Sequence, residues 1–239
     1  MTPMDRGAEN GQSHQSHQSF QPLQSLDLSE ATLVGSGTYR DVYTYPGRGD
    51  LVVKVLRSGA GYQPGRPIRN FLKARSSRQL YRFMFREFET YLESRLSSLV
   101  PEVPFPISHL CWLQETSLGL GMVAERVGGP NAGPARSLAT LQKEGGITDH
   151  HLTALNRFID ALVRLDVIAN DTNPGNVLLD ETGPELRFVL VDGFGDPSPL
   201  GLKKIFKKLR QNARDRRFEN MAEFLGLRWD AAQMRLVRE

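Results

Sequence analysis

The sequence IANDTNPGNVLLDETGPELRFVLVDGFG, from Ile168 to Gly195, guides the interpretation of the rest of the chain. It contains two polar segments beside short apolar runs. The first carries Asp171 with Asn176 five residues later, and the second begins at Asp192 with Asp-Gly-Phe-Gly. Apolar runs bounded by Gly, Pro, Asn and Asp predict strands joined by turns. Because functional side chains concentrate on loops held by a rigid support, the stretch predicts two functional loops beside a strand pair.

The bulk composition predicts a folded protein with one large domain or one domain in two parts. The chain has 239 residues, of which 39% are hydrophobic, and this is enough to form a core. The net charge is only +3, so any binding of polyanions must come from local clusters. The sequence has no apolar run of transmembrane length and no secretory signal pattern, which predicts a cytoplasmic protein without a transmembrane segment.

Two further features are assigned no function. Residues 1–25 are rich in Gln, Ser and His, and this composition predicts a disordered tail in which His14 and His17 are solvated. The single cysteine, Cys111, excludes an intramolecular disulfide and a cysteine-only zinc site. It lies in the apolar run HLCWL, which predicts a buried thiol in a strand.

Three antiparallel strands are predicted between Leu26 and Leu56, with turns at Gly35-Ser36-Gly37 and at Pro46 to Gly49. The third strand, Leu51 to Leu56, places Lys54 among valines. A lysine in such a run either faces solvent or is held by a charged partner inside a cleft. On its own, the usual exposure of lysine favours the solvent-facing position.

The central part of the chain predicts two helices separated by two strands. Helical spacing of apolar residues predicts helices from Lys73 to Ser98 and from Asp149 to Val167, with Tyr91 and Leu92 both on the apolar face of the first. Strands are expected over residues 107–114 and 118–127, followed by the Gly/Pro-rich connection AERVGGPNAGP. At the polar start of the second helix, His150 and His151 are expected to cap it or to be solvated.

Residues 202–225 predict one or two amphipathic helices that are strongly basic. The basic residues are Lys203, Lys204, Lys207, Lys208, Arg210, Arg214, Arg216 and Arg217. Such a face can be solvated only, or it can bind an acidic partner, a membrane surface or nucleic acid. The solvated face is the preferred interpretation.

The ordered motifs suit triphosphate chemistry. Glycines in a turn let backbone amides approach phosphate oxygens, and Lys54 supplies a positive charge for the same oxygens. Asn176 and Asp192 offer the oxygen ligands that Mg²⁺ requires. Asp171 stands where a carboxylate could orient and deprotonate an attacking hydroxyl.

In these motifs the chain from about Leu26 to its end resembles the protein kinase-like fold, and more narrowly the bacterial YrbL family, the PhoP regulatory network proteins. GSGTYRDVY resembles the glycine-rich loop, with Arg40 in place of its third glycine, and VVKV resembles the strand that carries the nucleotide-binding lysine. REFETYLESRL resembles the helix whose glutamate pairs with that lysine, and MVAERV resembles the hinge beside the adenine pocket. NDTNPGN is similar to the catalytic loop and DGFG to the metal-binding loop.

The resemblance implies an α+β, two-lobed protein kinase-like fold. Its antiparallel-sheet N-lobe would span residues 26–127, and a reduced helical C-lobe would span residues 128–239. It also implies ATP and Mg²⁺ as ligands. The implied catalytic residues are Asp171, Lys54 and Glu87, with Glu89 as the second candidate for the helix glutamate. The implied nucleotide-binding residues are Gly35, Ser36, Gly37, Thr38, Lys54, Glu125 and Val127, the last two through backbone hydrogen bonds to the base, and the metal ligands are Asn176 and Asp192.

The chain also departs from the kinase pattern. Ala169-Asn170 replaces the usual His-Arg, Asn173 replaces the catalytic-loop lysine, and few residues follow Gly195. The first hypothesis is a phosphotransferase that acts on an unidentified small-molecule or protein acceptor. The departures favour an alternative, a catalytically weak pseudokinase-like regulator in bacterial stress or envelope signalling. A basic-helix adaptor for nucleic acid or a membrane surface is the third.

Overall fold

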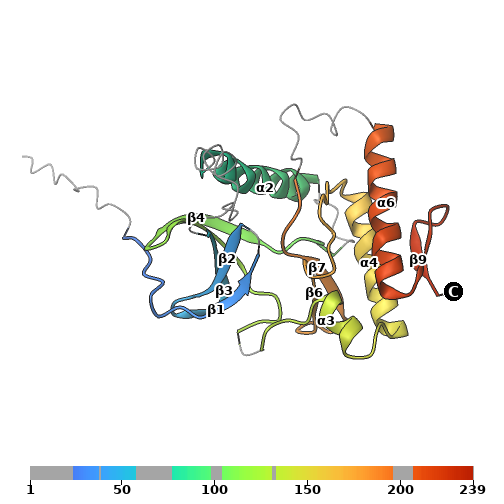
Figure 1. Ribbon diagram of the computed structural model, residues 1–239, viewed down its shortest axis with the longest axis horizontal. Helices are drawn as coiled ribbons and strands as arrows, with labels where there is room; N and C mark the ends of the chain where they lie inside the picture. The colour runs from blue at the N-terminus through green and yellow to red at the C-terminus, as the bar shows by residue number, and fades with distance from the viewer. Residues whose placement is uncertain are drawn as a thin grey trace, which may run out of the picture.

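The computed structural model describes residues 24–37, 39–57, 77–97, 104–130, 133–195 and 207–238. Within these ranges the protein is α+β, with an antiparallel sheet at one end and helices with two short strand pairs at the other (Figure 1). In chain order the elements are β1 (Leu33–Ser36), β2 (Arg40–Tyr45), β3 (Arg48–Leu56), α2 (Ser77–Ser97), β4 (Leu110–Thr116), β5 (Gly119–Glu125), α3 (Leu138–Lys143), α4 (Asp149–Arg164), β6 (Val177–Asp180), β7 (Arg187–Leu190), α6 (Lys207–Leu225), β8 (Arg228–Asp230) and β9 (Arg235–Val237).

The five-stranded sheet has the order β1-β2-β3-β5-β4, and its strand pairs are antiparallel. The three predicted N-terminal strands are confirmed, although β3 begins earlier than predicted, at Arg48. Val42, Lys54 and Met122 lie directly opposite one another across β2, β3 and β5. Because side chains alternate along a strand, these three side chains share one face of the sheet.

The other face of the sheet is covered by the segment that precedes β1. Leu28 packs there with Leu51, Val53, Val55 and Val123, all of them buried. The segment is also held at the sheet edge, since the N–H of Leu26 donates to the carbonyl of Glu115 at 2.9 Å. The predicted disordered tail falls almost wholly outside the described residues.

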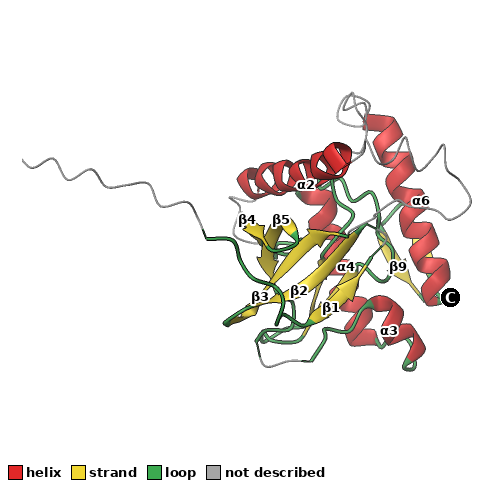
Figure 2. Cartoon of the chain, turned by 60° about the vertical axis from the view of Figure 1, so that its left-hand side comes forward, coloured by secondary structure: helices red, strands yellow, loops and turns green. Residues whose placement is uncertain are grey.

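Helix α2 crosses the sheet on the side that carries Lys54 (Figures 1 and 2). Met84, Glu87 and Tyr91 are buried on its inner side, as helical spacing requires, whereas Leu92 is 47% exposed, contrary to the prediction that it lies on the apolar face. Residues 73–76 and 98 of the predicted helix lie outside the described part of the chain.

Helix α4 forms the centre of the other end, with Leu155, Ile159 and Leu162 buried. Thr148 caps it, and His151 completes a capping box by accepting from the Thr148 N–H, which confirms the predicted capping. The helix ends at Arg164, earlier than predicted, because Asp166 adopts a positive φ of 52°.

The C-terminal region differs from the prediction of basic amphipathic helices alone. Helix α6 buries Phe218, Met221, Ala222 and Leu225, and the chain then forms the hairpin β8–β9, which the sequence did not predict. Of the basic residues named above, Lys203 and Lys204 lie outside the described ranges. Arg214 and Arg217 are half-buried, so this part of the helix is not a purely solvated face.

The prediction of a buried thiol at Cys111 is wrong, because this residue is exposed. It lies on β4, one of the two edge strands of the sheet, where the register with β5 shifts between Leu110 and Trp112. A bulge of this kind leaves one residue unpaired and changes the side to which the following side chains point. Among the helices of the described ranges, none combines the length and hydropathy needed to cross a bilayer.

Candidate functional site

A cleft between the sheet and the helical end contains the predicted site residues that the structure describes, except Glu89, the second candidate for the helix glutamate, which is exposed and lines neither cavity of the cleft. One cavity of about 400 Å³ lies elsewhere, but two others adjoin in this cleft, with volumes of about 290 and 570 Å³. The smaller is lined by Gly35, Ser36, Gly37, Lys54, Glu125, Val127, Asn176 and Asp192. The larger adds Glu87 and Asp171 and shares Ser36, Gly37, Arg40, Asn176 and Asp192 with the smaller. Thr38 lies outside the described residues.

The two loops of the central stretch are joined by backbone hydrogen bonds. The carbonyl of Gly193 accepts from the N–H groups of Asn170 and Asp171 at 2.7 and 2.8 Å, and the N–H of Gly195 donates to Ile168 at 2.8 Å. Gly193 has a φ of 80°, and a Cβ at this position would lie 2.6 Å from the Cβ of Asp171. Glycine is therefore required there, and the positions of Asp171 and Asp192 are fixed together.

Lys54 is only 4% exposed, so the solvent-facing position favoured from the sequence is wrong. Its Nζ donates to the carbonyl of Val191, the residue immediately before Asp192. Burial lowers the pKa of Lys54, and the nearby Asp192 carboxylate offsets part of that effect. The lysine thus connects β3 to the start of the Asp-Gly-Phe-Gly loop.

Glu87 lies beside this lysine but forms its ion pair with Arg40, whereas the resemblance implied a pair with Lys54. The guanidinium of Arg40 donates from Nη1 to Glu87 Oε2 and from Nη2 to Glu87 Oε1, the latter at 2.7 Å. The same Nη2 also donates to Asp192 Oδ1. Bidentate pairing of an arginine with a carboxylate is among the strong charge-assisted interactions. Arg40 therefore links β2, α2 and the Asp192 loop.

The sequence did not assign this role to Arg40, although a signal was present. Arg40 replaces the third glycine of the glycine-rich pattern, where a kinase loop would have no side chain. It begins β2 two residues before Val42, so it points to the same face of the sheet as Lys54. Its side chain is 13% exposed, which shows that it lies within the cleft.

The pKa values of Asp192 and Glu87, two acidic residues of the cleft, are shifted in opposite directions. Burial raises the pKa of Asp192, but Arg40 and Lys54 outweigh it and hold that pKa below its usual value. Burial of Glu87 has the larger effect at that residue, so its pKa is raised despite the pair with Arg40. Asp192 is consequently a carboxylate at neutral pH and suited to binding a cation.

The loop that carries Asp171 is ordered by its own asparagines. Asp171 Oδ1 accepts from the N–H of Asn173 at 3.0 Å, and Asn173 Oδ1 accepts from the N–H of Gly175 at 2.9 Å. Asn176 donates from Nδ2 to the Asp171 carbonyl at 3.4 Å, so its Oδ1 is the atom that could bind a cation. Asn173, which replaces the catalytic-loop lysine, thus shapes the turn.

The donor set fits magnesium with one complication. No group of three or more His, Cys, Asp or Glu side chains that could hold a metal occurs within the described ranges. Mg²⁺ is usually held by one or two protein oxygens together with substrate phosphates and water, and Asn176 and Asp192 line one cavity. The Asp192 carboxylate, however, is already paired with Arg40.

Glu125 and Val127 lie at the far side of the smaller cavity, where the resemblance placed contacts to the base. The N–H of Glu125 already donates to the carbonyl of His109 at 2.8 Å. Its carboxylate binds Arg187 at 3.1 Å. Glu125 therefore has no free N–H to offer a base, whereas the buried Val127 stays a candidate for the predicted contact.

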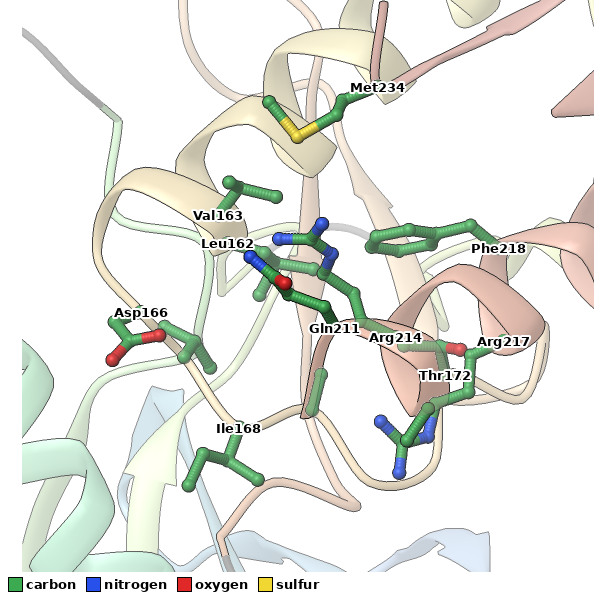
Figure 3. A pocket seen from close by; sticks show the side chains of 13 residues that line it. Leu162, Val163, Asp166, Ile168, Thr172, Gln211, Arg214, Arg217, Phe218 and Met234 are labelled. Carbon is green, nitrogen blue, oxygen red and sulfur yellow. The ribbon is translucent and has the colours of Figure 1, made fainter. Parts of the chain in front are cut away.

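The cavity of about 400 Å³ lies between α4, the loop before Asp171 and α6 (Figure 3). Leu162, Phe218 and Met234 contribute apolar walls, and Arg214 and Arg217 contribute charge. Nη2 of Arg217 donates to Asn170 Oδ1 at 3.3 Å. Burial lowers the pKa of Arg217, and the Asp171 carboxylate offsets part of that shift. The sequence missed this pocket because its walls come from separate parts of the chain.

The described residues define an α+β protein with a cleft that gathers a glycine turn, a buried lysine and two aspartate loops. Residues 26–226 match the family model described as "PhoP regulatory network protein YrbL", and the chain belongs to this YrbL family. A comparison with curated protein sequences gives no match.

Among solved structures, the crystal structure of WbdD aligns with 73% of this chain at 17% sequence identity and a TM-score of 0.42. The aligned region spans about a third of the WbdD chain, namely 34%. Membership of the YrbL family therefore rests on the family match.

Proposed function

We propose that this protein is a two-lobed, protein kinase-like phosphotransferase of the bacterial cytoplasm that binds ATP with Mg²⁺ in the cleft. The observation that carries the proposal is the convergence of the predicted residues. Glycines of β1 and its turn, Lys54 of β3, and the loops at Asp171 and Asp192 are far apart in sequence yet line adjoining cavities. Their combined size suits a nucleotide, since ligand cavities usually measure about 300–1,000 Å³.

Each part has a role in this proposal. The turn at Gly35, Ser36 and Gly37 offers backbone amides to phosphate oxygens, and Lys54 adds a positive charge. Asn176 and Asp192 would hold the metal ion, which supplies charge neutralisation of the phosphates when bound. Asp171 is exposed and positioned by the asparagine turn, so it can accept the proton of an acceptor hydroxyl.

The pocket between α4 and α6 is the proposed side of entry for the acceptor. It includes Thr172, the residue after Asp171, and Arg217, which donates to the side chain of Asn170, the residue before Asp171. Apolar walls with two arginines would suit a small molecule that has an apolar body and an anionic group. The nucleotide and the acceptor would then approach Asp171 from different sides.

Turnover tests this proposal. Purified protein with γ-labelled ATP and Mg²⁺ should transfer phosphate to a member of a broad acceptor panel, and Asp171→Ala should lower the rate at least about a hundredfold, the usual contribution of a general base. If the wild type transfers no more phosphate than Asp171→Ala across the panel, phosphotransferase activity is rejected.

A second candidate function is a nucleotide-binding regulator with little or no turnover. Two observations favour it: Arg40 occupies the Asp192 carboxylate, and Asn173 uses its side chain to hold the turn. This protein would bind ATP but fail the turnover test. Binding of ATP together with absent transfer therefore separates the two candidates.

A further inference from the structure

The cation that the structure places on Asp192 is the guanidinium of Arg40. On the basis of the proposed function, we propose that Arg40 is a resident cation of the nucleotide site and competes with the divalent metal ion for Asp192. The affinity of the site for nucleotide would therefore depend little on a metal ion as long as Arg40 is bound to Asp192. Arg40 is thus a positioning residue that sets the metal dependence of binding.

The contacts around Asp192 support direct competition. Its Oδ1 accepts from Nη2 of Arg40 and also from the N–H of Gly193, the latter at 2.6 Å. A metal ion needs lone pairs of the same carboxylate, and a cation placed there would lie next to the guanidinium charge. Two cations bound to one carboxylate repel each other; water screens part of this repulsion, since the Asp192 side chain is 38% exposed, but the Arg40 side chain is only 13% exposed. Both therefore cannot occupy Asp192 without a cost to each.

The anchoring of Arg40 makes the exchange a local one. Arg40 makes two hydrogen bonds to Glu87 and one to Asp192, and Glu87 is buried on α2. Leaving Asp192 breaks one of these bonds and preserves the pair with Glu87. The guanidinium can therefore remain in the cleft, beside the place proposed for the phosphates, while a metal ion takes the carboxylate.

The position of Arg40 in the chain explains why it reaches this carboxylate. It shares a face of the sheet with Lys54, and Lys54 holds the Val191 carbonyl directly before Asp192. Two basic side chains thus converge on the first residues of the Asp-Gly-Phe-Gly loop. A glycine at position 40 would remove the guanidinium and leave only Lys54 of these two basic residues. Glu87 would then be free to pair with Lys54.

The test is a titration of the full chain with Mn²⁺, in which electron paramagnetic resonance measures free Mn²⁺. Arg40→Ala should lower the dissociation constant for Mn²⁺ at least about tenfold, the effect expected from loss of one charge-assisted bond to the carboxylate. Arg48→Ala is the matched control, because it removes an exposed arginine of the same sheet that pairs with Asp50. It should leave the Mn²⁺ dissociation constant unchanged.

Arg40→Ala leaves the buried Glu87 carboxylate without the guanidinium that pairs with it, and this could destabilise the fold. A second variant controls for this effect. Arg40→Ala combined with Glu87→Gln removes both charges of that pair and should show the same tighter binding of Mn²⁺. If either folded variant binds Mn²⁺ no more tightly than the wild type, competition by Arg40 is wrong.

Calorimetry with ADP, in excess Mg²⁺ and in a chelator, tests the consequence for nucleotide. We divide the dissociation constant for ADP in the chelator by the dissociation constant for ADP in excess Mg²⁺. This ratio should be at least about tenfold larger for Arg40→Ala than for the wild type. An unchanged ratio overturns the inference. Absence of ADP binding in all variants would instead reject the proposed function, while the Mn²⁺ titration would still decide the role of Arg40.

Discussion

Gly193 fixes the geometry between Asp171 and Asp192. Its φ is positive, and a Cβ would meet the Cβ and the carbonyl oxygen of Asp171 at 2.6 and 2.7 Å. We expect Gly193→Ala to lower the free energy of unfolding by at least about 1–3 kcal/mol, because it adds both strain and overlap. Urea unfolding measures this loss.

Gly183→Ala is the control for this prediction, because Gly183 has an ordinary φ and the nearest atom to its added Cβ would be 3.7 Å away. It should change the free energy of unfolding by less than about 1 kcal/mol. Equal effects of the two substitutions would show that the contact with Asp171 is unimportant for stability.

We expect the stability of the protein to depend on pH through His109. Its ring is stacked on Phe105, with centroids 5.7 Å apart, and its Nδ1 lies 3.2 Å from the Tyr91 hydroxyl. Burial lowers the pKa of His109 below its ordinary value of 6.5, with Glu125 opposing that shift. The folded state therefore favours the neutral ring. The stability from this group is present above about pH 6.5 and is lost as the pH falls toward the folded pKa.

Unfolding measured at pH 7 and pH 5 tests this sign. His109→Gln should lose less stability than the wild type between these two values, because its side chain does not titrate. His150→Gln, at an exposed position, should behave as the wild type does. A larger loss in His109→Gln than in the wild type would contradict the prediction.

At the scale of single residues, the sequence predicted which side chains gather but not all of their partners. The convergence of Asp171, Asn176 and Asp192 in one cleft could be predicted because their loops have characteristic spacings. The pairing of Arg40 with Glu87 could not, because it depends on which of two basic residues on neighbouring strands reaches α2. The burial of Cys111 was predicted wrongly because the bulge in β4 has no clear signal in the sequence.

Among the elements, the hairpin β8–β9 depends on one side chain of α4. Asn156 donates from Nδ2 to the Leu236 carbonyl at 2.9 Å and accepts the Leu236 N–H at 2.7 Å. Because Leu236 is buried, Asn156→Ala leaves both backbone groups without these partners. We expect a loss of about 1–3 kcal/mol in the free energy of unfolding.

Asp160→Ala on the same helix is the control for this prediction. It removes an exposed ion pair with Arg164, which lies at 2.8 Å, and should cost no more than about 0.5 kcal/mol. If Asn156→Ala costs as little as this control, the two hydrogen bonds of Asn156 contribute little to holding β9 on α4.

The elements with strong local signals were predicted best. Helix α4 has apolar residues at helical spacing, so its start was found at Asp149. The three N-terminal strands have turn residues between them and were also found. The hairpin β8–β9 was missed because its strands have three residues each, which is too short for alternation to show. Its stability comes from Asn156 and from Trp229 packing on Phe218, at 4.9 Å between ring centroids.

At the scale of the whole molecule, nucleotide binding should connect the sheet with the helical end. A ligand at a hundred times its dissociation constant adds about 2.7 kcal/mol to the free energy of unfolding. We expect Asp192→Asn to keep the part of this gain that ADP gives in a chelator and to lose the additional part that Mg²⁺ gives, which should be small in the wild type and larger in Arg40→Ala. Thermal unfolding with ADP, with and without Mg²⁺, measures both parts. A full Mg²⁺-dependent gain in Asp192→Asn would exclude Asp192 as the metal ligand.

For the whole chain, the order of the motifs along the sequence predicted the shared cleft but not the pocket between α4 and α6. The order of glycine turn, strand lysine, helix glutamate and two aspartate loops predicted that these residues share a cleft, and the described ones do. The pocket beside Arg217 could not be predicted, because α6 returns to the Asp171 loop through tertiary packing that no local pattern encodes.

We expect the cleft to bind an adenine nucleotide through Lys54, and calorimetric titration with ATP tests this binding. The wild type should bind one ATP per chain. Lys54→Met, which keeps a similar volume without the charge, should fold but bind at least about tenfold more weakly, as expected from loss of a charge-assisted contact. Absence of binding by the wild type at millimolar ATP, with and without Mg²⁺, or equal affinity in Lys54→Met, would contradict the claim.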